Sequence, residues 1–268
     1  MTSRAFARTL AAPAVALLAL VGIGPLLYAL WTGFREGSLA DLFRDPRFGK
    51  SIFTTGLIMA AAVALELSLG FGLALTLHKL KRRGTILTLI LVPSALAPLI
   101  VGVVWWMLFN TTYGAVNALL GTSIDWTRSM PWALVAVIVA VVWQGTPLVA
   151  VLLLGGLGTV PPSLLEAARL DGAGPWATLR HVTLPHLRPF FLAAGLLVLL
   201  EVARLYEIPF ALTEGGPGDE TAVAGLHLFK MAFVASNFGG ASLMALLMTL
   251  ALSVVAALYV RIVSRRSA

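Results

Sequence analysis

Six long apolar stretches constrain this chain more than any other feature of its sequence. A bilayer's hydrocarbon layer is about 30 Å thick, and a helix rising 1.5 Å per residue crosses it in about 20 residues. Each stretch is long enough to do so, which predicts an all-α, polytopic membrane protein. The predicted transmembrane helices are residues 10–32, 52–77, 86–109, 132–154, 189–212 and 241–260.

The composition supports this class and excludes others. Hydrophobic residues make up 59% of the 268 residues and charged residues only 12%, whereas soluble domains carry about 25% charged residues. The absence of cysteine excludes a disulfide framework and a thiol metal site. The net charge of +7 could indicate nucleic-acid binding. The basic residues, however, cluster beside the ends of apolar stretches, as membrane topology requires. We therefore expect a lipid bilayer as partner and no nucleic acid.

The distribution of Lys and Arg between alternate loops predicts the orientation. Loops on the cytoplasmic side of membrane proteins are enriched in both residues. The side that carries both termini holds twice as many as the other. Its basic residues are Arg4, Arg8, Lys79, Lys81, Arg82, Arg83, Arg169, Arg180, Arg188, Arg261, Arg265 and Arg266. The opposite side holds Arg35, Arg44, Arg47, Lys50, Arg128 and Lys230. Both termini are therefore expected in the cytoplasm. The first apolar stretch is too long for a signal peptide, so we interpret it as a retained span.

A polar segment, Glu166–Pro185, interrupts the apolar sequence with a distinctive spacing. It reads Glu-Ala-Ala, three residues, Gly172, nine residues, and then Val-Thr-Leu-Pro. Ser163 and Glu166 fit a capping box at the start of a short helix. Asp171-Gly172 can end that helix, and Pro175 suits the start of a second one. Local structure alone is therefore compatible with an ordinary helix-turn-helix loop.

The full spacing resembles the EAA loop of bacterial ABC importer permeases, with Val182 where Ile is usual. The resemblance implies that the coupling loop, residues 155–188, rests on a separate ATPase subunit in the cytoplasm. It also implies one transmembrane domain, residues 1–268, with a permease core at about 50–260. The ATPase-coupling residues that it implies are Glu166, Ala167, Ala168, Asp171, Gly172, Leu184 and Pro185.

A second segment, Leu212–Thr221, reads LTEGGPGDET. Taken alone, its glycines and proline indicate a turn. The segment also resembles the LTxGGP…T sequence of the binding-protein-dependent sugar permeases, such as the maltose, glycerol-phosphate and trehalose types. The resemblance implies an external loop at Gly215, Gly216 and Pro217 and a saccharide, polyol or glycerophosphate-type solute. Tyr206-Glu207 stands where that branch usually has Phe-Asp.

The resemblance also implies the partners and the mechanism. A solute-binding protein outside the inner membrane delivers the solute, a second homologous permease completes the pore, and two ATPase subunits drive alternating access. ATP and Mg²⁺ are expected on the ATPase subunits, with no cofactor and no enzymatic activity in this chain. In agreement, the sequence contains no G-x-x-x-x-G-K-[ST] phosphate loop. No metal site is expected.

Ionisable residues inside predicted spans are candidates for the solute path, because charge is costly in hydrocarbon. Glu201, Arg204 and Glu207 are three residues apart, so a continuous helix would make them neighbours. They could neutralise one another, or Arg204, Tyr206 and Glu207 could bind solute hydroxyls beside a backbone loosened by Pro209. Further candidates in other spans are Trp143 with Gln144, as a stacking face beside an amide, and Glu66.

Three alternatives remain open. The chain could be an ABC permease for a non-sugar solute. It could be an ion-coupled secondary transporter that uses Glu66, Glu201 and Glu207 as proton carriers. It could also be a membrane scaffold without transport activity.

Overall fold

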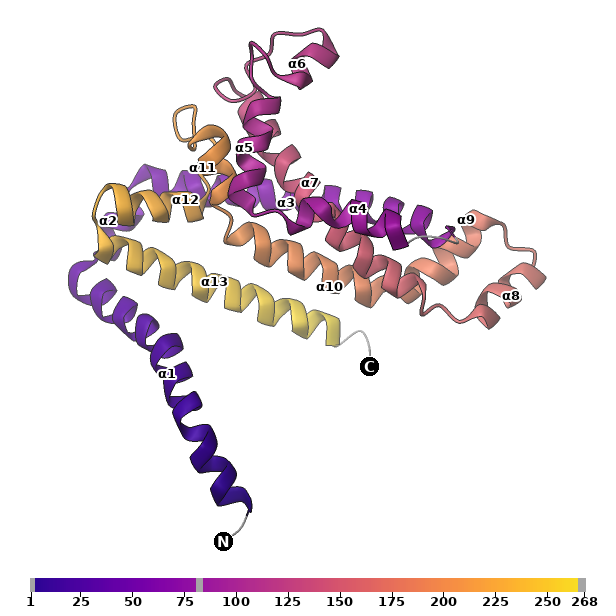
Figure 1. Ribbon diagram of the computed structural model, residues 1–268, viewed down its shortest axis with the longest axis horizontal. Coiled ribbons are helices and arrows are strands. Elements are labelled where there is room, and N and C mark those ends of the chain that lie inside the picture. Colours follow the sequence, from indigo (N-terminus) through magenta and orange to yellow (C-terminus); the bar gives the residue numbers. More distant parts are fainter. Residues whose placement is uncertain (1–2, 81–83, 265–268) are drawn as a thin grey trace. The chain divides into compact units, whose positions relative to one another are not determined.

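Helices and their connecting loops make up the protein. The structure is a computed structural model that describes residues 3–80 and 84–264 (Figure 1). The basic residues Lys81, Arg82, Arg83, Arg265 and Arg266 lie outside these ranges. No β-strand occurs in the described ranges, so the all-α prediction is confirmed.

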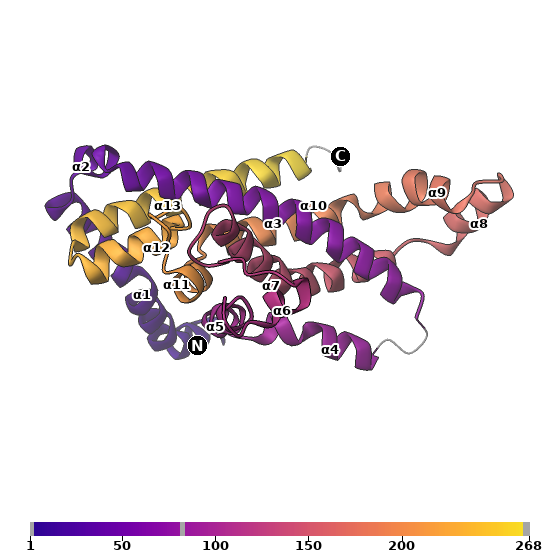
Figure 2. The ribbon, with the colours of Figure 1, turned by 90° about the horizontal axis from the view of Figure 1, so that it is seen from above.

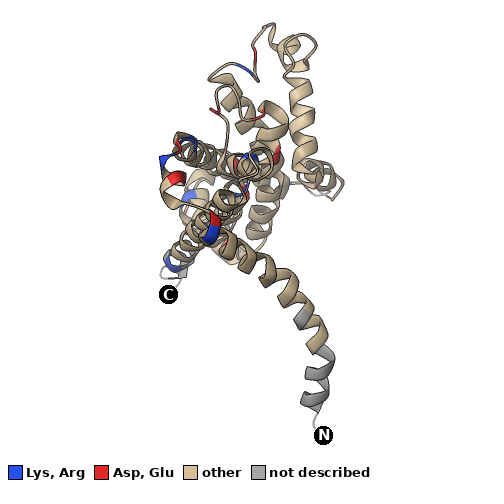
Figure 3. Ribbon diagram, turned by 90° about the vertical axis from the view of Figure 1, so that its left-hand side faces the viewer, with Lys and Arg blue, Asp and Glu red and all other residues tan. Residues whose placement is uncertain are grey.

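Within the described residues, five helices are long and apolar enough to cross a membrane. They are α1 (Ser3–Glu36), α3 (Pro46–His78), α7 (Trp132–Leu157), the run from Pro175 to Ala203, and α13 (Phe238–Ser264). A sixth candidate is the pair α4 (Gly84–Ala95) and α5 (Pro98–Leu108), counted as one broken span. These elements correspond to the six apolar stretches of the sequence. The long helices carry few charged side chains (Figure 3), as residence in a bilayer requires.

The described chain divides into two compact units. The first unit comprises Met1–Pro46 and Leu228–Ser253, and contains α1, the short α2 (Leu39–Arg44), the π-helical turn η2 (Lys230–Val234) and the first part of α13. Within it, α1 contacts α13 where Thr32 Oγ1 lies 3.0 Å from Ser242 Oγ. Much of α1 is uncovered, and Leu18 and Leu20 are among its exposed side chains. Lipid would cover such a surface.

The second unit comprises Arg47–His227 and Val254–Ala268. Its central helix is α7, half of whose most apolar window is buried. This helix packs against α4, α5 and α10 (Leu184–Ala203), and lies among α3, α5 and α10 in the view from above (Figure 2). The unit also contains α6 (Ala115–Leu120), α8 (Pro162–Leu170), α9 (Pro175–Thr178), η1 (Leu179–Thr183), α11 (Glu207–Thr213) and most of α12 (Ala224–Phe229).

The third predicted span bends far more sharply than a kinked helix. Its halves, α4 and α5, meet at 93° in a break between Ala95 and Pro98. Gln144 of α7 bonds to this break twice. Its side-chain Nε2 donates to the Leu96 carbonyl at 2.8 Å, and its backbone carbonyl accepts from Ser94 Oγ at 2.7 Å. The third predicted span is therefore broken at this point, and a neighbouring helix stabilises the break.

The fifth predicted span, residues 189–212, is not one helix, so that prediction is wrong. Helix α10 ends at Ala203 and α11 begins at Glu207. Pro209 explains the restart, because proline lacks an N–H and fits only where a helix does not need one, in its first turn. Tyr206, with φ −147° and ψ −32°, precedes that turn. The break therefore lies between Ala203 and Glu207, just before Pro209.

Candidate functional site

The predicted coupling residues lie on two short helices that project from one end of the second unit (Figure 1). Helix α8 begins at Pro162 with Pro161 as its N-cap, and no side chain caps it. The capping box predicted for Ser163 and Glu166 is therefore wrong. Proline is favoured at the first helical position because its fixed φ suits a helix and its missing N–H is not needed there. Pro162 takes that position and moves Ser163 inside the helix.

The end of α8 agrees with the prediction from Asp171-Gly172. Gly172 adopts φ +75°, in the left-handed region. The amide of Ala173 donates to the Ala168 carbonyl at 2.9 Å, and the amide of Gly172 donates to the Arg169 carbonyl at 3.1 Å. This arrangement is a Schellman-type cap, which favours glycine at the left-handed position. As predicted, α9 begins at Pro175, and it continues through η1 into α10.

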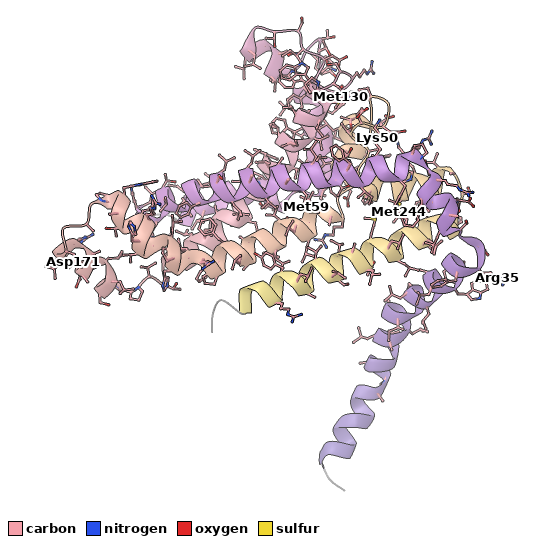
Figure 4. All side chains as sticks on the ribbon, turned by 180° about the vertical axis from the view of Figure 1, so that it is seen from behind. Arg35, Lys50, Met59, Met130, Asp171 and Met244 are labelled. Carbon is pink, nitrogen blue, oxygen red and sulfur yellow. The ribbon has the colours of Figure 1, made fainter. Side chains whose placement is uncertain are left out.

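The projecting helices expose an apolar surface beside polar groups. Leu170 is 89% exposed and Trp176 is 71% exposed. Figure 4 shows Asp171 at the outer end of the projection. Of the predicted coupling residues, Glu166, Ala167, Asp171, Gly172 and Pro185 are exposed, Leu184 is half-buried and Ala168 is buried. Exposed apolar side chains ringed by polar groups are typical of protein-docking surfaces.

The loop after α11 holds the second sequence motif in a defined turn. Thr221 organises it: Oγ1 donates to the Gly216 carbonyl at 2.7 Å and lies 2.7 Å from Thr213 Oγ1. The amide of Thr221 also donates to the Gly215 carbonyl at 3.1 Å. Thr221 is fully buried. The threonines at both ends of the motif therefore bind each other and close the loop that contains Pro217.

The first turns of α3 hold this loop from the side. Lys50, labelled in Figure 4, lies with Nζ 2.8 Å from Glu220 Oε1 and donates to the Gly218 carbonyl at 2.8 Å. Arg47 Nε lies 3.6 Å from Asp219 Oδ2. Sequence reasoning did not assign these two basic residues to the loop. The only available signal was charge complementarity between Arg47 and Lys50 and the Asp219-Glu220 pair.

The predicted solute-path residues separate into two groups. A polar cavity of about 270 Å³ in the second unit is lined by Glu66 of α3, Gln144 and Gly145 of α7, Glu201 of α10, Arg204 and Glu207. Trp143 instead lines an apolar cavity of about 540 Å³, where its ring meets Trp105 edge to face at 5.8 Å. The structure thus brings Glu66 to the charged residues and separates Trp143 from Gln144. Tyr206 is not among the residues that line the polar cavity.

Among the described residues, the charged groups that line this cavity form no ion pair with one another. Arg204 is the residue after α10 and Glu207 is the first of α11, so they are not neighbours on one helix. Over the described ranges, Arg204 forms no ion pair with Glu201 or Glu207. Glu207 Oε2 accepts a long hydrogen bond, 3.4 Å, from the amide of Tyr206. Internal pairing therefore does not account for these charges.

Glu66 is the most enclosed of the four charged residues. It is 2% exposed, and its Oε2 accepts no hydrogen bond from the described residues. The carboxylate approaches the backbone of α7 at Gly145, where a Cβ would overlap it. Sequence reasoning identified Glu66 as a lone charge, but it did not identify Gly145, which makes the approach possible.

Comparison with known proteins decides the family. Residues 66–268 match the family described as binding-protein-dependent transport system inner membrane component. The chain belongs to this family. The family description places the chain among the inner membrane components of transport systems, in agreement with its apolar spans.

Two curated relatives match nearly the whole chain. One is the sulfoquinovosyl glycerol transport system permease protein SmoG of Agrobacterium fabrum, 30% identical over 97% of this chain and 91% of its own length. Another is the trehalose transport system permease protein SugA of Mycobacterium tuberculosis, 30% identical over 98% of this chain and 90% of its own. Among solved structures, a chain of a bacterial alginate ABC transporter, in complex with a periplasmic protein bound to an alginate pentasaccharide, aligns with a TM-score of 0.84. It is 17% identical and covers 95% of this chain and 92% of that one, which shows a shared fold.

Proposed function

We propose that this chain is the pore-forming permease subunit of an ATP-driven ABC importer for a saccharide or related polyol. The observation that carries the proposal is the match, over almost the full length, to permeases named for sulfoquinovosyl glycerol and trehalose. Both solutes contain a sugar, and both relatives belong to transport systems. The chain itself performs no chemistry in this proposal; it provides a path that opens alternately to each side of the membrane.

The projecting helices α8 and α9 transmit the motion of the ATPase subunits. Leu170 and Trp176 supply apolar contacts, and Glu166 and Asp171 supply polar ones at the rim. ATP and Mg²⁺ belong to the ATPase subunits, whose closure moves this helix pair. Because α9 continues through η1 into α10, a displacement of α9 is carried toward Glu201 and Arg204. The projecting end is accordingly cytoplasmic, and so are both termini.

The opposite end of α3 receives the solute-binding protein. Helix α3 has 33 residues, so it is about 50 Å long at 1.5 Å per residue. Its first turns hold the loop that contains Gly215, Gly216 and Pro217. The alginate transporter, whose fold this chain shares, is in complex with a periplasmic protein. That precedent supports a binding protein here, and a second, homologous permease is proposed to complete the pore.

The break between α10 and α11 forms part of the solute path. A helix interruption at membrane depth is tolerated where it is buried in protein or lines a water-filled cavity. Arg204 and Glu207 present charged groups to such a cavity, and Tyr206 lies in the same interruption. The hydroxyl groups of a sugar would bond to the charged groups, and an apolar face of the sugar ring would stack on the Tyr206 ring.

Uptake by the complete transporter in proteoliposomes tests the function. The complex of this chain, the second permease and the ATPase is supplied with its binding protein and with radiolabelled trehalose, maltose or glycerol phosphate. We expect uptake of at least one of these solutes that requires ATP. Uptake without ATPase subunits would support an ion-coupled transporter instead. The same assay is repeated with radiolabelled amino acids and inorganic anions, and uptake of these solutes alone would support a non-sugar permease.

Two variants test the solute path. Tyr206→Ala and Glu207→Gln should raise KM or lower the rate of uptake at normal membrane levels. Tyr113→Ala is the matched control, because Tyr113 is 64% exposed in the loop between α5 and α6 and lines none of the cavities described above. Unchanged KM and rate for both Tyr206→Ala and Glu207→Gln would remove the α10–α11 break from the path.

A further inference from the structure

The cavity at the α10–α11 break combines an excess of carboxyl groups with one carboxyl that lacks a partner. Three of its lining residues, Glu66, Glu201 and Glu207, are acidic, and Arg204 is its one basic lining residue. Even without Glu66, Glu201 and Glu207 outnumber Arg204 among the lining residues. The lining of the cavity is therefore acidic in composition.

Internal ion pairs do not account for this excess of acidic residues. Throughout residues 3–80 and 84–264, Arg204 makes no ion pair with the carboxylates that share its cavity. Elsewhere in the second unit, acidic residues do find partners: Glu220 lies 2.8 Å from Lys50 Nζ. The acidic groups of the cavity are therefore available to a solute. Repulsion between these groups and an anionic solute would be stronger here than in bulk water, because the effective dielectric constant near protein is lower.

Glu66 adds a second and independent indication that a ligand enters. It is 2% exposed, lines the cavity and has an Oε2 that accepts no hydrogen bond from the described chain. A buried carboxyl without a donor is costly. Gly145 leaves room for this group where any Cβ would overlap it. Glu66 thus places a carboxyl group at the cavity wall, and a solute hydroxyl is a suitable donor to it.

We propose that this cavity selects saccharides that carry no negative charge, neutral sugars or amino sugars, and that Glu66 accepts a hydrogen bond from a solute hydroxyl. The inference rests on the proposed function, because it names the solute class for the same path. Hydroxyl and ammonium donors bond favourably to carboxylates. A uronate or sulfonate would instead face at least two carboxylates with one guanidinium to offset them. Charge therefore separates this solute from that of the relative named for sulfoquinovosyl glycerol.

Thiol reagents measure the charge selection directly, and the natural absence of cysteine makes the chain suitable. Val141 lines the cavity and is replaced by cysteine with little change in volume. In the assembled transporter, Val141→Cys is treated with methanethiosulfonate reagents bearing trimethylammonium or sulfonate. Each rate is normalised to that of a free thiol in solution. Leu119→Cys is the control, because Leu119 is 87% exposed on α6 and does not line the cavity.

The normalised rate with the cationic reagent should exceed the anionic rate at least tenfold at Val141→Cys and lie near equality at Leu119→Cys. Adding Glu201→Gln and Glu207→Gln to Val141→Cys should remove most of this preference. Equal rates, or faster reaction with sulfonate, would overturn the inference. So would a lack of reaction with both reagents, because a cavity that admits no small ion selects no solute. None of these outcomes depends on which sugar is imported.

Uptake kinetics test Glu66 separately. Glu66→Gln keeps an amide oxygen as acceptor, whereas Glu66→Leu removes every acceptor at similar size. KM for the imported solute should rise at least tenfold more in Glu66→Leu than in Glu66→Gln, with equal amounts of assembled complex. Equal KM values would remove Glu66 from the path. Import of a uronate in preference to its neutral counterpart would refute the charge selection, whereas import of no saccharide at all would refute the proposed function itself.

Discussion

The carboxyl group of Glu66 on α3 lies against the backbone of Gly145 on α7, at a point where a methyl group would overlap it. Helices in membranes commonly approach closely where one of them carries a small residue. Here the small residue admits a buried carboxyl rather than another backbone. The contact therefore depends on both residues, and each can be changed separately.

Gly145→Ala should destabilise the protein. The new methyl group has no space, and overpacking of this kind costs about 1–3 kcal/mol. Gly155→Ala, on the same helix, is the control, because nothing lies within 4 Å of the Cβ it would add. Apparent melting temperatures of the purified complex in detergent should fall for Gly145→Ala and stay level or rise for Gly155→Ala. A combined Gly145→Ala and Glu66→Ala variant should recover part of the lost stability. Equal melting temperatures of Gly145→Ala and Gly155→Ala would contradict the close contact.

The sequence predicted the spans because each depends on a long local run of apolar residues. It predicted the end of α8 and the start of α9 because Gly172 and Pro175 act through their own backbone geometry. It failed at the start of α8 and at the break between α10 and α11, where a local proline decides the structure, and at the break between α4 and α5, where a distant residue does. The sharp break between α4 and α5 is stabilised by Gln144, which is almost fifty residues away in the sequence. No local pattern reports that partnership.

The candidate site shows the same division. Glu66, Glu201, Arg204 and Glu207 were selected because charges inside apolar stretches are costly, and they meet in one cavity. The expectation that Glu201, Arg204 and Glu207 are neighbours on one continuous helix was wrong, because a new helix, α11, begins at Glu207 with Pro209 in its first turn. Gly145 could not be selected from the sequence, since its importance comes only from its contact with Glu66.

Gly172→Ala should impair coupling between the ATPase and the pore. Gly172 has φ +75°, and an alanine in the left-handed region costs about 1–2 kcal/mol. The strain would shift the turn between α8 and α9. Gly174→Ala is the control, because Gly174 has φ −69° and open space around its Cα. Substrate-stimulated ATP hydrolysis should drop severalfold in Gly172→Ala only. Full stimulation in both variants would show that the turn geometry is not required for docking.

Thr221→Val should loosen the loop that contains Gly216. The change removes a fully buried hydroxyl that bonds to the Gly216 carbonyl and to Thr213. Leaving those groups without a partner costs about 1–3 kcal/mol. Thr76→Val is the control, because its exposed hydroxyl bonds only to the Leu73 carbonyl of its own helix. Hydrogen exchange of the amides at 215–221 should accelerate in Thr221→Val alone. Unchanged exchange there would contradict the role assigned to this hydroxyl.

Two leucines of nearly equal exposure test the orientation. Leu170, at the end of α8, is 89% exposed, and Leu119, on α6, is 87% exposed. Replacement of either by cysteine gives a single thiol in a chain that has no other. The projecting helices are proposed to face the cytoplasm, and α6 lies in the connection between the third and fourth spans, which would then face outward. An impermeant maleimide should label Leu119→Cys in intact cells and leave Leu170→Cys unlabelled.

Permeabilised cells provide the control for this orientation. Leu170→Cys should become reactive once the reagent reaches the cytoplasm, provided that the complex is made without its ATPase subunits, which would otherwise cover α8. Restoring the ATPase should then protect this thiol severalfold, and Leu119→Cys should be unaffected. Labelling of Leu170→Cys in intact cells would invert the topology derived from Lys and Arg. Equal labelling of Leu170→Cys with and without the ATPase would contradict the docking role of α8 and leave the orientation unaffected.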